Sequence, residues 1–333
     1  MVSLTSRGLF CEAGGFYIDP WEPVERAVVT HAHSDHLQAG SRLYLTTAAG
    51  APLVRARVGA DAAIETVAYG ETISRDGVRV SLHPAGHILG SAQVRIEGGG
   101  EVWVVSGDYK LEPDPTCVPF EPVRCHTFLT ESTFGLPVYR WRPQSEVFGE
   151  IETWWSANRD AGKASVLFVY PLGKAQRVLA AIRPAALHPV YCHGSVERYN
   201  RIYSASGVAL SPASMVVDAP AGTDWTGSLI IAPPMNSTAP FLRRFGRVST
   251  ALASGWMRIR GTRRRRSLDR GFVLSDHADW TQLLDAIRST GAEHVWTTHG
   301  YSNVLARWLQ ENGIGAKAVE TRFTAAEEEE QEE

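Results

Sequence analysis

A run of six residues at positions 31–36 constrains this chain more than any other part of its sequence. It reads HAHSDH and holds three histidines and one aspartate. Residues 27–30, AVVT, are typical of a β-strand, so the run falls on the turn after a strand. Imidazole and carboxylate groups are ligands that divalent metals take in proteins. We therefore expect His31 and His33 to bind one metal ion, and Asp35 and His36 to reach a second ion close by.

Three further candidate ligands each follow a strand-like segment and lie near glycine. His87 stands in HPAGHILGS after residues 78–82, Asp108 in SGDYK after residues 101–105, and His299 in TTHG after residues 294–297. The ends of strands are where open α/β sheets place functional side chains. Together with the first run, these residues would complete two coordination shells.

The rest of the chain alternates between strand-like and helix-like segments. Strands are expected at 101–105, 127–130, 166–170, 229–231, 272–274 and 294–297, and helices at 145–157, 174–183, 281–289 and 304–312. This alternation predicts an α/β protein. The middle of the chain reads as a separate strand–helix unit, whereas the candidate ligands lie on both sides of it. That pattern indicates an inserted domain.

The combined motifs resemble those of the metallo-β-lactamase superfamily and, more narrowly, of the β-CASP nucleases, which include ribonuclease J, the cleavage-and-polyadenylation endonuclease and Artemis. Glu131 in TESTFG is similar to motif A of that family, His277 in SDHADW to motif B, and His299 to motif C. FVYPLGKAQ at 168–176 resembles the opening of the family's insert, and SGW at 254–256 resembles its return segment. The resemblance covers residues 16–323. In its compact length, the chain most resembles the bacterial DNA-ligase-associated exonucleases.

The resemblance implies a particular fold and division of the chain. The fold would be a metallo-β-lactamase αββα sandwich with an inserted α/β β-CASP domain. The sandwich would comprise residues 1–138 and 255–323, and the insert residues 139–254. Residues 327–333 are almost wholly acidic, and residues 324–333 are expected to form a disordered acidic tail.

The resemblance also implies a role for each candidate ligand. The first metal would be held by His31, His33 and His87, the second by Asp35, His36 and His299, and Asp108 would bridge both. Zn²⁺ is the expected metal, with Mn²⁺ as the alternative. Two such ions ~3.5–4 Å apart would activate a bridging hydroxide for in-line attack on phosphorus.

Other residues would complete the chemistry. His277 would protonate the leaving oxygen and Glu131 would orient it, so the catalytic set is His277, Glu131, Asp108 and Asp35. Asp19, in FYIDP, would support the histidine run from behind the ligands.

Candidate substrate contacts are less specific. Residues 263–266 are four consecutive arginines. Phosphate contacts are expected from Ser254, Gly255, Thr262, Arg263 and Arg264. Lys174 and Arg177 either line the cleft or lie on the surface. Trp154, Trp155 and Trp256 either stack on bases or belong to the core.

The expected function is hydrolysis of DNA, as an exonuclease in DNA repair that works with an ATP-dependent DNA ligase and a helicase. RNA processing of the ribonuclease J type is the main alternative, and a small-molecule metallohydrolase is a third. RNA-processing members of the family have a histidine at the position of His299, but the ligase-associated group has one there too. The substrate therefore stays open between DNA and RNA, and so does the polarity of cleavage.

Composition sets limits on partners and location. The net charge is −3, so positive charge for nucleic acid must be local. The four cysteines form no CxxC pair, which favours reduced thiols in the cytoplasm. No apolar run approaches the ~20 residues that span a bilayer, so no membrane association is expected.

Overall fold

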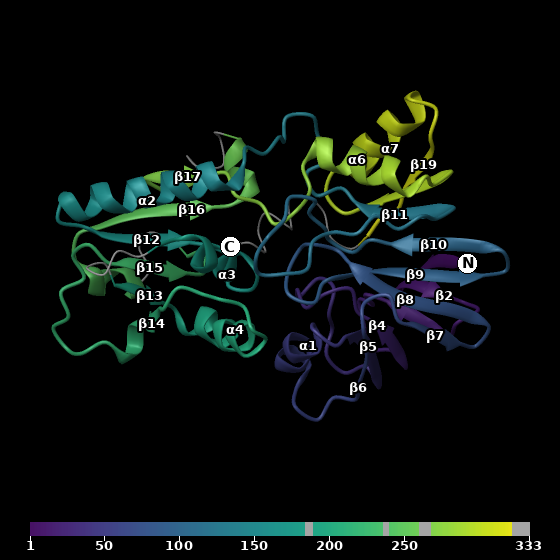
Figure 1. Ribbon diagram of the computed structural model, residues 1–333, viewed down its shortest axis with the longest axis horizontal. Coiled ribbons are helices and arrows are strands. Elements are labelled where there is room, and N and C mark those ends of the chain that lie inside the picture. Colours follow the sequence, from purple (N-terminus) through teal and green to yellow (C-terminus); the bar gives the residue numbers. More distant parts are fainter. Residues whose placement is uncertain (184–188, 236–239, 260–267, 322–333) are drawn as a thin grey trace. The chain divides into compact units, whose positions relative to one another are not determined.

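The computed structural model describes residues 1–183, 189–235, 240–259 and 268–321 (Figure 1). The chain forms two compact units. The first comprises residues 1–139 and the described residues from 277 onward, and the second comprises residues 140–276. The chain therefore leaves the first unit after Tyr139 and re-enters it at His277.

Two β-sheets form the first unit. One has six strands in the order β1 (Val2–Thr5), β2 (Gly8–Cys11), β3 (Phe16–Ile18), β4 (Arg26–Val28), β5 (Leu43–Thr47) and β6 (Ile64–Val67). The other has seven strands in the order β19 (Gly315–Ala318), β18 (His294–Thr298), β11 (Thr127–Glu131), β10 (Glu101–Val105), β9 (Ala92–Gly98), β8 (Val78–Pro84) and β7 (Thr72–Arg75). Alternate residues of β8, Val78, Val80 and Leu82, join Val28 and Leu45 in the apolar core between the sheets.

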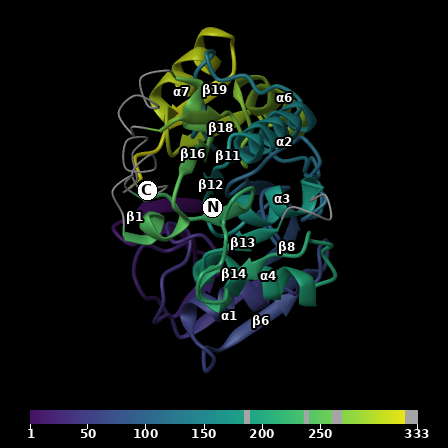
Figure 2. The same ribbon diagram turned by 90° about the vertical axis from the view of Figure 1, so that its left-hand side faces the viewer.

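Helices cover the outer faces of these sheets. Helices α6 (Trp280–Thr290) and α7 (Ser302–Glu311) lie beside β11 in both views (Figures 1 and 2). Leu283 of α6 and Leu305 of α7 pack with Phe128 of β11. Helix α1 (Ala51–Val58) contacts β5 and β6 of the other sheet. The predicted αββα sandwich is confirmed.

The second unit is built on one parallel sheet. Its strand order is β14 (Ser214–Met215), β13 (Val190–Cys192), β15 (Leu229–Ala232), β12 (Ala164–Phe168), β16 (Val248–Ala253) and β17 (Arg270–Phe272). Among its described residues, the helices are α2 (Gln144–Asp160), α3 (Lys174–Ala181) and α4 (Gly194–Ala205), with short 3₁₀ turns η1 (Val216–Asp218), η2 (Pro240–Phe245) and η3 (Gly255–Arg258).

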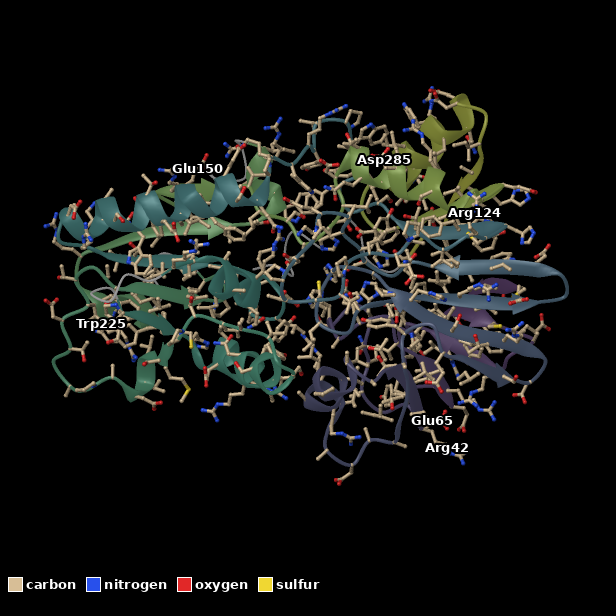
Figure 3. The ribbon with its side chains drawn as sticks, in the orientation of Figure 1. Arg42, Glu65, Arg124, Glu150, Trp225 and Asp285 are labelled. Atoms are coloured by element: carbon tan, nitrogen blue, oxygen red, sulfur yellow. The ribbon has the colours of Figure 1, made fainter. Side chains whose placement is uncertain are left out.

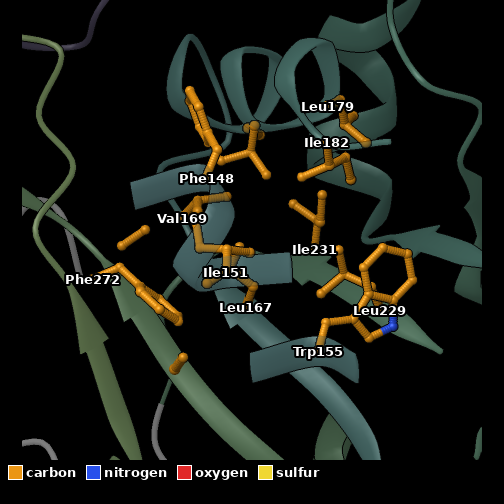
Figure 4. Close-up of a cluster of buried hydrophobic side chains, with 14 of the residues drawn as sticks. Phe148, Ile151, Trp155, Leu167, Val169, Leu179, Ile182, Leu229, Ile231 and Phe272 are labelled. Carbon is orange, nitrogen blue, oxygen red and sulfur yellow. The ribbon is translucent and has the colours of Figure 1, made fainter. Parts of the chain in front are cut away.

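Both faces of this parallel sheet are covered by apolar side chains. Every residue of β12 is buried, as expected of a central parallel strand. On one face, Phe148 and Ile151 of α2 pack against Leu167 and Ile231 (Figure 4). A second apolar cluster, which includes Val166 and other residues of β12, β15 and β16, covers the opposite face.

The insert ends later in the chain than the sequence analysis places it. Its predicted end, Ser254, directly follows β16. However, β17 pairs in parallel with β16, with Ala251 opposite Arg270. The second unit therefore continues to Asp276. The segment SGW at 254–256 directly follows strand β16. It is not where the chain returns to the first unit, because the edge strand β17 comes after it.

Charged side chains point away from the ribbons on the outside of the first unit. Arg42, Glu65 and Asp285 are examples (Figure 3). Arg42 pairs with Glu25 at 3.0 Å in an exposed ion pair. Within the described ranges, no helix is both long enough and apolar enough to cross a membrane. The predicted acidic tail lies outside the described residues.

Candidate metal centre

The HAHSDH run forms the turn that follows β4 in the first unit. Strand β4 lies between β3 and β5, so its carboxyl end brings the turn to an edge of the sandwich. His31, His33 and His36 are all buried, although they follow a strand of only three residues. Three buried imidazoles on one turn need polar partners, and these come from other strands.

Four side chains form a first cluster. His31, His33, His87 and Asp108 each place a donor atom within 4.8 Å of all the others. His87 follows β8 and Asp108 follows β10, so three separate strand ends meet here. The Nε2 atom of His87 lies 3.1 Å from Nδ1 of His33. The Oδ2 atom of Asp108 lies 3.4 Å from Nε2 of His31.

A second cluster contains Asp35, His36 and His299, again with donor atoms within 4.8 Å of one another. The Nε2 atom of His36 lies 3.4 Å from Asp35 and 3.4 Å from Oδ1 of Asp108. One oxygen of Asp108 thus faces the first cluster and the other faces the second. A ligand that bridges two metal ions needs this placement.

Two buried nitrogen atoms test whether the clusters fit metal ions. Nε2 of His31 and Nε2 of His36 are buried and have no hydrogen-bond partner among the described residues. A buried polar atom left in this state costs ~1–3 kcal/mol. Both atoms face the carboxylate of Asp108. Imidazole nitrogens that lie beside carboxylate oxygens in this way form a set of potential donors that fits divalent metal ions.

Asp19 supports the histidines from the outside. Its Oδ2 lies 2.7 Å from Nδ1 of His36, and its Oδ1 accepts the backbone N–H of Thr30 at 2.8 Å. The hydroxyl of Thr30 in turn lies 3.1 Å from Nδ1 of His31. Metal-bound histidines usually give their second N–H to an oxygen, and both contacts provide one. Thr30 is not among the residues predicted from the sequence, and its only signal there is its place directly before the run.

Two residues of this centre have an unusual backbone. Asp19 has φ 44° and His299 has φ 56°, both in the left-handed region that residues with a Cβ seldom adopt. Gly300, next to His299, has φ 53°. Such strain persists only where the surrounding structure holds it, and here it turns two polar side chains toward the clusters.

The histidines of the centre differ in their affinity for protons. Burial, together with the imidazoles of His31 and His277, lowers the pKa of His87 well below its ordinary value. Burial would also lower the pKa of His36, but the carboxylates of Asp108 and Asp35 outweigh it and raise that pKa well above its ordinary value. Protonation is therefore disfavoured at His87 and favoured at His36.

A further pair reaches the centre from distant parts of the chain. Nδ1 of His277 lies 3.0 Å from Oε2 and 3.2 Å from Oε1 of Glu131, and 3.9 Å from Oδ2 of Asp108. Glu131 ends β11, is buried, and accepts the backbone N–H of Tyr109 at 2.8 Å. The imidazole of His277 is thus held beside the carboxylate that lies between the two clusters.

Known proteins resemble this chain to different extents. No family model matches it. A probable DNA ligase from Opitutus terrae is 33% identical over 317 residues, which are 94% of this chain and 30% of that protein. The endoribonuclease YSH1 of Yarrowia lipolytica is 33% identical over 120 residues, which are 35% of this chain and 14% of that protein. Cleavage and polyadenylation specificity factor subunit 3 of Dictyostelium discoideum is 31% identical over 118 residues, which are 35% of this chain and 15% of that protein.

The chain belongs to the β-CASP family of the metallo-β-lactamase superfamily. It spans less than a third of the length of each of these relatives. A crystal structure of a protein of unknown function from Enterococcus faecalis V583 shares the fold, with a TM-score of 0.57 and 11% identity. That likeness covers 88% of this chain and 78% of the other.

Several residues expected to serve substrate binding in this β-CASP protein have other contacts. Trp154 and Trp155 are buried, and their indole N–H groups donate to Ser249 and to the carbonyl of Gly227. Both side chains belong to the core, so the alternative that they stack on nucleic-acid bases is wrong. Trp256 is buried as well.

Lys174 and Arg177 are also buried, which excludes the surface position considered for them. Both face Asp276, a partner the sequence analysis did not identify. Ser254 is buried and its hydroxyl accepts the N–H of Trp256 at the start of η3, which includes Gly255. Thr262, Arg263 and Arg264 lie outside the described residues. The phosphate contacts expected from these five positions stay predictions.

Proposed function

We propose that this chain is a metal-dependent nuclease that hydrolyses phosphodiester bonds of DNA, as an exonuclease in DNA repair. The observation that carries the proposal is the His277–Glu131 pair beside Asp108, the carboxylate between the two clusters. Hydrolysis of a phosphodiester needs charge neutralisation, an activated water and a proton for the leaving oxygen. The site holds residues suited to all three.

The metal ligands we propose are those brought together in the two clusters. His31, His33 and His87 would hold one ion, Asp35, His36 and His299 the other, and Asp108 both. When bound, such a pair of ions supplies an activated water and neutralises the charge on the phosphate oxygens. Zn²⁺ suits the histidine-rich set, and Mn²⁺ is the alternative because carboxylates contribute.

The protein's own part in bond cleavage centres on His277. Because Nδ1 of His277 faces Glu131, its second nitrogen is the one left to give a proton to the leaving oxygen as the P–O bond breaks. The carboxylate of Glu131 favours the protonated imidazole and fixes its orientation. A positioned general acid of this kind contributes ~10²–10⁴-fold to the rate.

DNA is the substrate we propose, supported by the likeness to a probable DNA ligase over 94% of this chain. The same likeness supports a DNA ligase as a partner, and a helicase belongs to the same proposal. RNA is the second candidate, supported by the likeness to the endoribonuclease YSH1 over 35% of the chain. A cytoplasmic location is also proposed, because the four cysteines form no CxxC pair and fit reduced thiols.

A time course on end-labelled strands tests these proposals. DNA and RNA of one sequence, single- and double-stranded and labelled at either end, are incubated with EDTA, Zn²⁺ or Mn²⁺. Shortening from one end in a metal-dependent manner is expected for DNA. Faster loss of RNA would instead favour the second candidate.

Variants then test the site. Asp35→Ala should abolish the activity, and His277→Ala should reduce it by ~10²–10⁴-fold. Asp285→Ala and His294→Ala, at exposed positions on α6 and β18, are the matched controls and should keep it. Full activity of both site variants would show that the site is assigned wrongly.

A further inference from the structure

One buried carboxylate in the second unit is held by two basic side chains of helix α3. Asp276 places Oδ1 2.9 Å from Nη1 of Arg177 and Oδ2 3.7 Å from Nζ of Lys174. Lys174 and Arg177 stand three residues apart, on one face of the helix. The side chains of all three residues are at most 4% exposed. Both oxygens of the carboxylate are therefore engaged.

Arg177 also joins the two ends of the insert. Its Nε donates to Oε1 of Gln144 at 2.8 Å, and Nη1 donates to the carbonyl oxygen of Ser275 as well as to Asp276. Gln144 begins α2, shortly after the chain enters the second unit. Ser275 and Asp276 are the last residues before the chain leaves it. One guanidinium thus fixes the outgoing chain to the incoming chain.

The residue directly after this anchor is His277. Its imidazole pairs with Glu131 in the first unit, and the next backbone N–H, of Ala278, donates to the carbonyl of Tyr109 at 2.7 Å. His277 is therefore fixed on one side by contacts of the first unit and on the other by the covalent link to Asp276. A shift of Asp276 would move the backbone that carries the imidazole.

We propose that Arg177, assisted by Lys174, is a positioning residue for His277. By holding Asp276, Arg177 keeps the neighbouring His277 in line for proton transfer to the leaving oxygen. The proposal rests on the function of His277 as the acid described above. Arginine suits the task because its fork of N–H donors serves Gln144, Ser275 and Asp276 together. A lysine has one nitrogen and cannot reach all three oxygens in the same geometry.

Two substrates that differ in the leaving group separate positioning from mere stability. DNA releases a sugar alkoxide, which needs a proton. Bis(p-nitrophenyl) phosphate releases nitrophenolate, which leaves without one. A defect in the acid therefore slows DNA cleavage and spares the aryl ester, whereas a defect in folding or metal binding slows both.

The variants are Arg177→Met, Arg177→Lys and Asp276→Asn, with His277→Ala as the reference. Asp276→Asn keeps the size of the side chain, so the test does not depend on whether the arginine variants fold. Arg201→Gln is the matched control, since Arg201 lies on α4 of the same unit in an exposed pair with Glu197. Thermal unfolding and metal content are measured for every variant.

We expect His277→Ala to lose ~10²–10⁴-fold in kcat on DNA. The Arg177 and Asp276 variants should lose roughly 10–10²-fold, as small misplacements of a reacting group do. All should stay within about threefold of the parent on the aryl ester, since an interaction used only for proton transfer is then not needed. Arg201→Gln should match the parent on both substrates.

Equal losses on both substrates in the Arg177 and Asp276 variants, while His277→Ala spares the aryl ester, would overturn the positioning role alone. Equal losses on both substrates in His277→Ala would instead overturn the acid role of His277, and with it this inference. The two failures are therefore distinguishable.

Discussion

Oδ2 of Asp19 lies 2.7 Å from Nδ1 of His36, although the two residues stand on different turns of the first sheet. Asp19 follows β3 and reaches this position with a left-handed backbone, φ 44°. Its other oxygen accepts the N–H of Thr30, so the carboxylate cannot turn away. The contact leaves Nε2 of His36 as the nitrogen directed toward Asp35 and Asp108.

Asp19→Asn should weaken metal binding without unfolding the protein. The amide is nearly isosteric but carries no charge, so it orients and polarises His36 less well. Loss of such an outer contact typically costs 10–100-fold in metal affinity. Competition with a chromogenic chelator measures the metal affinity. Asp76→Asn is the control, because Asp76 also has a left-handed backbone but pairs with Arg26 at the surface. Unchanged affinity in Asp19→Asn would contradict the support role.

Glu131→Gln should slow DNA cleavage while leaving the metal content unchanged. The amide oxygen can still accept the N–H of Tyr109, so the end of β11 stays in place. The imidazolium form of His277 loses its counter-charge, and we expect kcat to fall by roughly 10–10²-fold. Glu97→Gln, in a surface pair with Arg95, serves as control. A loss of bound metal in step with the loss of rate would contradict this account.

The sequence predicts the ligand clusters because their chemistry is local. Each candidate ligand is a metal-binding residue type that stands just after a strand, as in HAHSDH, His87, Asp108 and His299. The ends of neighbouring strands come together in a sandwich, so these residues meet. Buried strands such as β12 and β15 are recognisable for a similar reason, since a run of apolar β-forming residues has few other uses.

Contacts between distant residues were not predictable in the same way. Arg177 and Asp276 are 99 residues apart, and neither shows from its neighbours that it is buried. A buried charge requires its partner, so its burial is fixed only once the fold places both. The end of the insert was misplaced for a related reason. Strand β17 has three residues and lies at the edge of its sheet, where the pairing with β16 rather than its composition defines it.

The buried thiol of Cys192 should make the protein less stable in alkaline solution. Burial and the nearby carboxylate of Glu197 raise the pKa of Cys192 to about 12, from an ordinary value of 9.0. Below pH 9 the folded and unfolded states both keep the proton. Between pH 9 and 12 only the folded state keeps it, so the free energy of unfolding falls as pH rises.

Denaturant titrations from pH 8 to pH 10.5 measure this slope. Cys192→Ala should reduce the slope, whereas Cys117→Ala, at a half-buried position, is the comparison. The same thiol should react with disulfide reagents only as fast as the protein opens, because the thiolate is the nucleophile. Rapid labelling of native Cys192 at neutral pH would contradict the raised pKa.

Gly300→Ala should damage the second cluster through the backbone. Gly300 has φ 53°, and an added Cβ would lie 2.4 Å from Cα of Thr133 and 2.5 Å from the carbonyl oxygen of Ser132. Both obstacles are backbone atoms that cannot rotate away. We expect a loss of roughly 2–5 kcal/mol in stability from strain and overpacking combined. Because His299 is the preceding residue, metal affinity should fall as well.

Gly313→Ala separates the two causes. Gly313 also has a positive φ, 80°, but an added Cβ there meets no described atom within 4 Å. It should therefore show only the cost of a left-handed alanine, ~1–2 kcal/mol, and full metal affinity. Thermal unfolding with and without Zn²⁺ compares the two variants. If Gly300→Ala lost no more stability than Gly313→Ala and bound metal normally, close packing of Gly300 could not be what holds His299 in place.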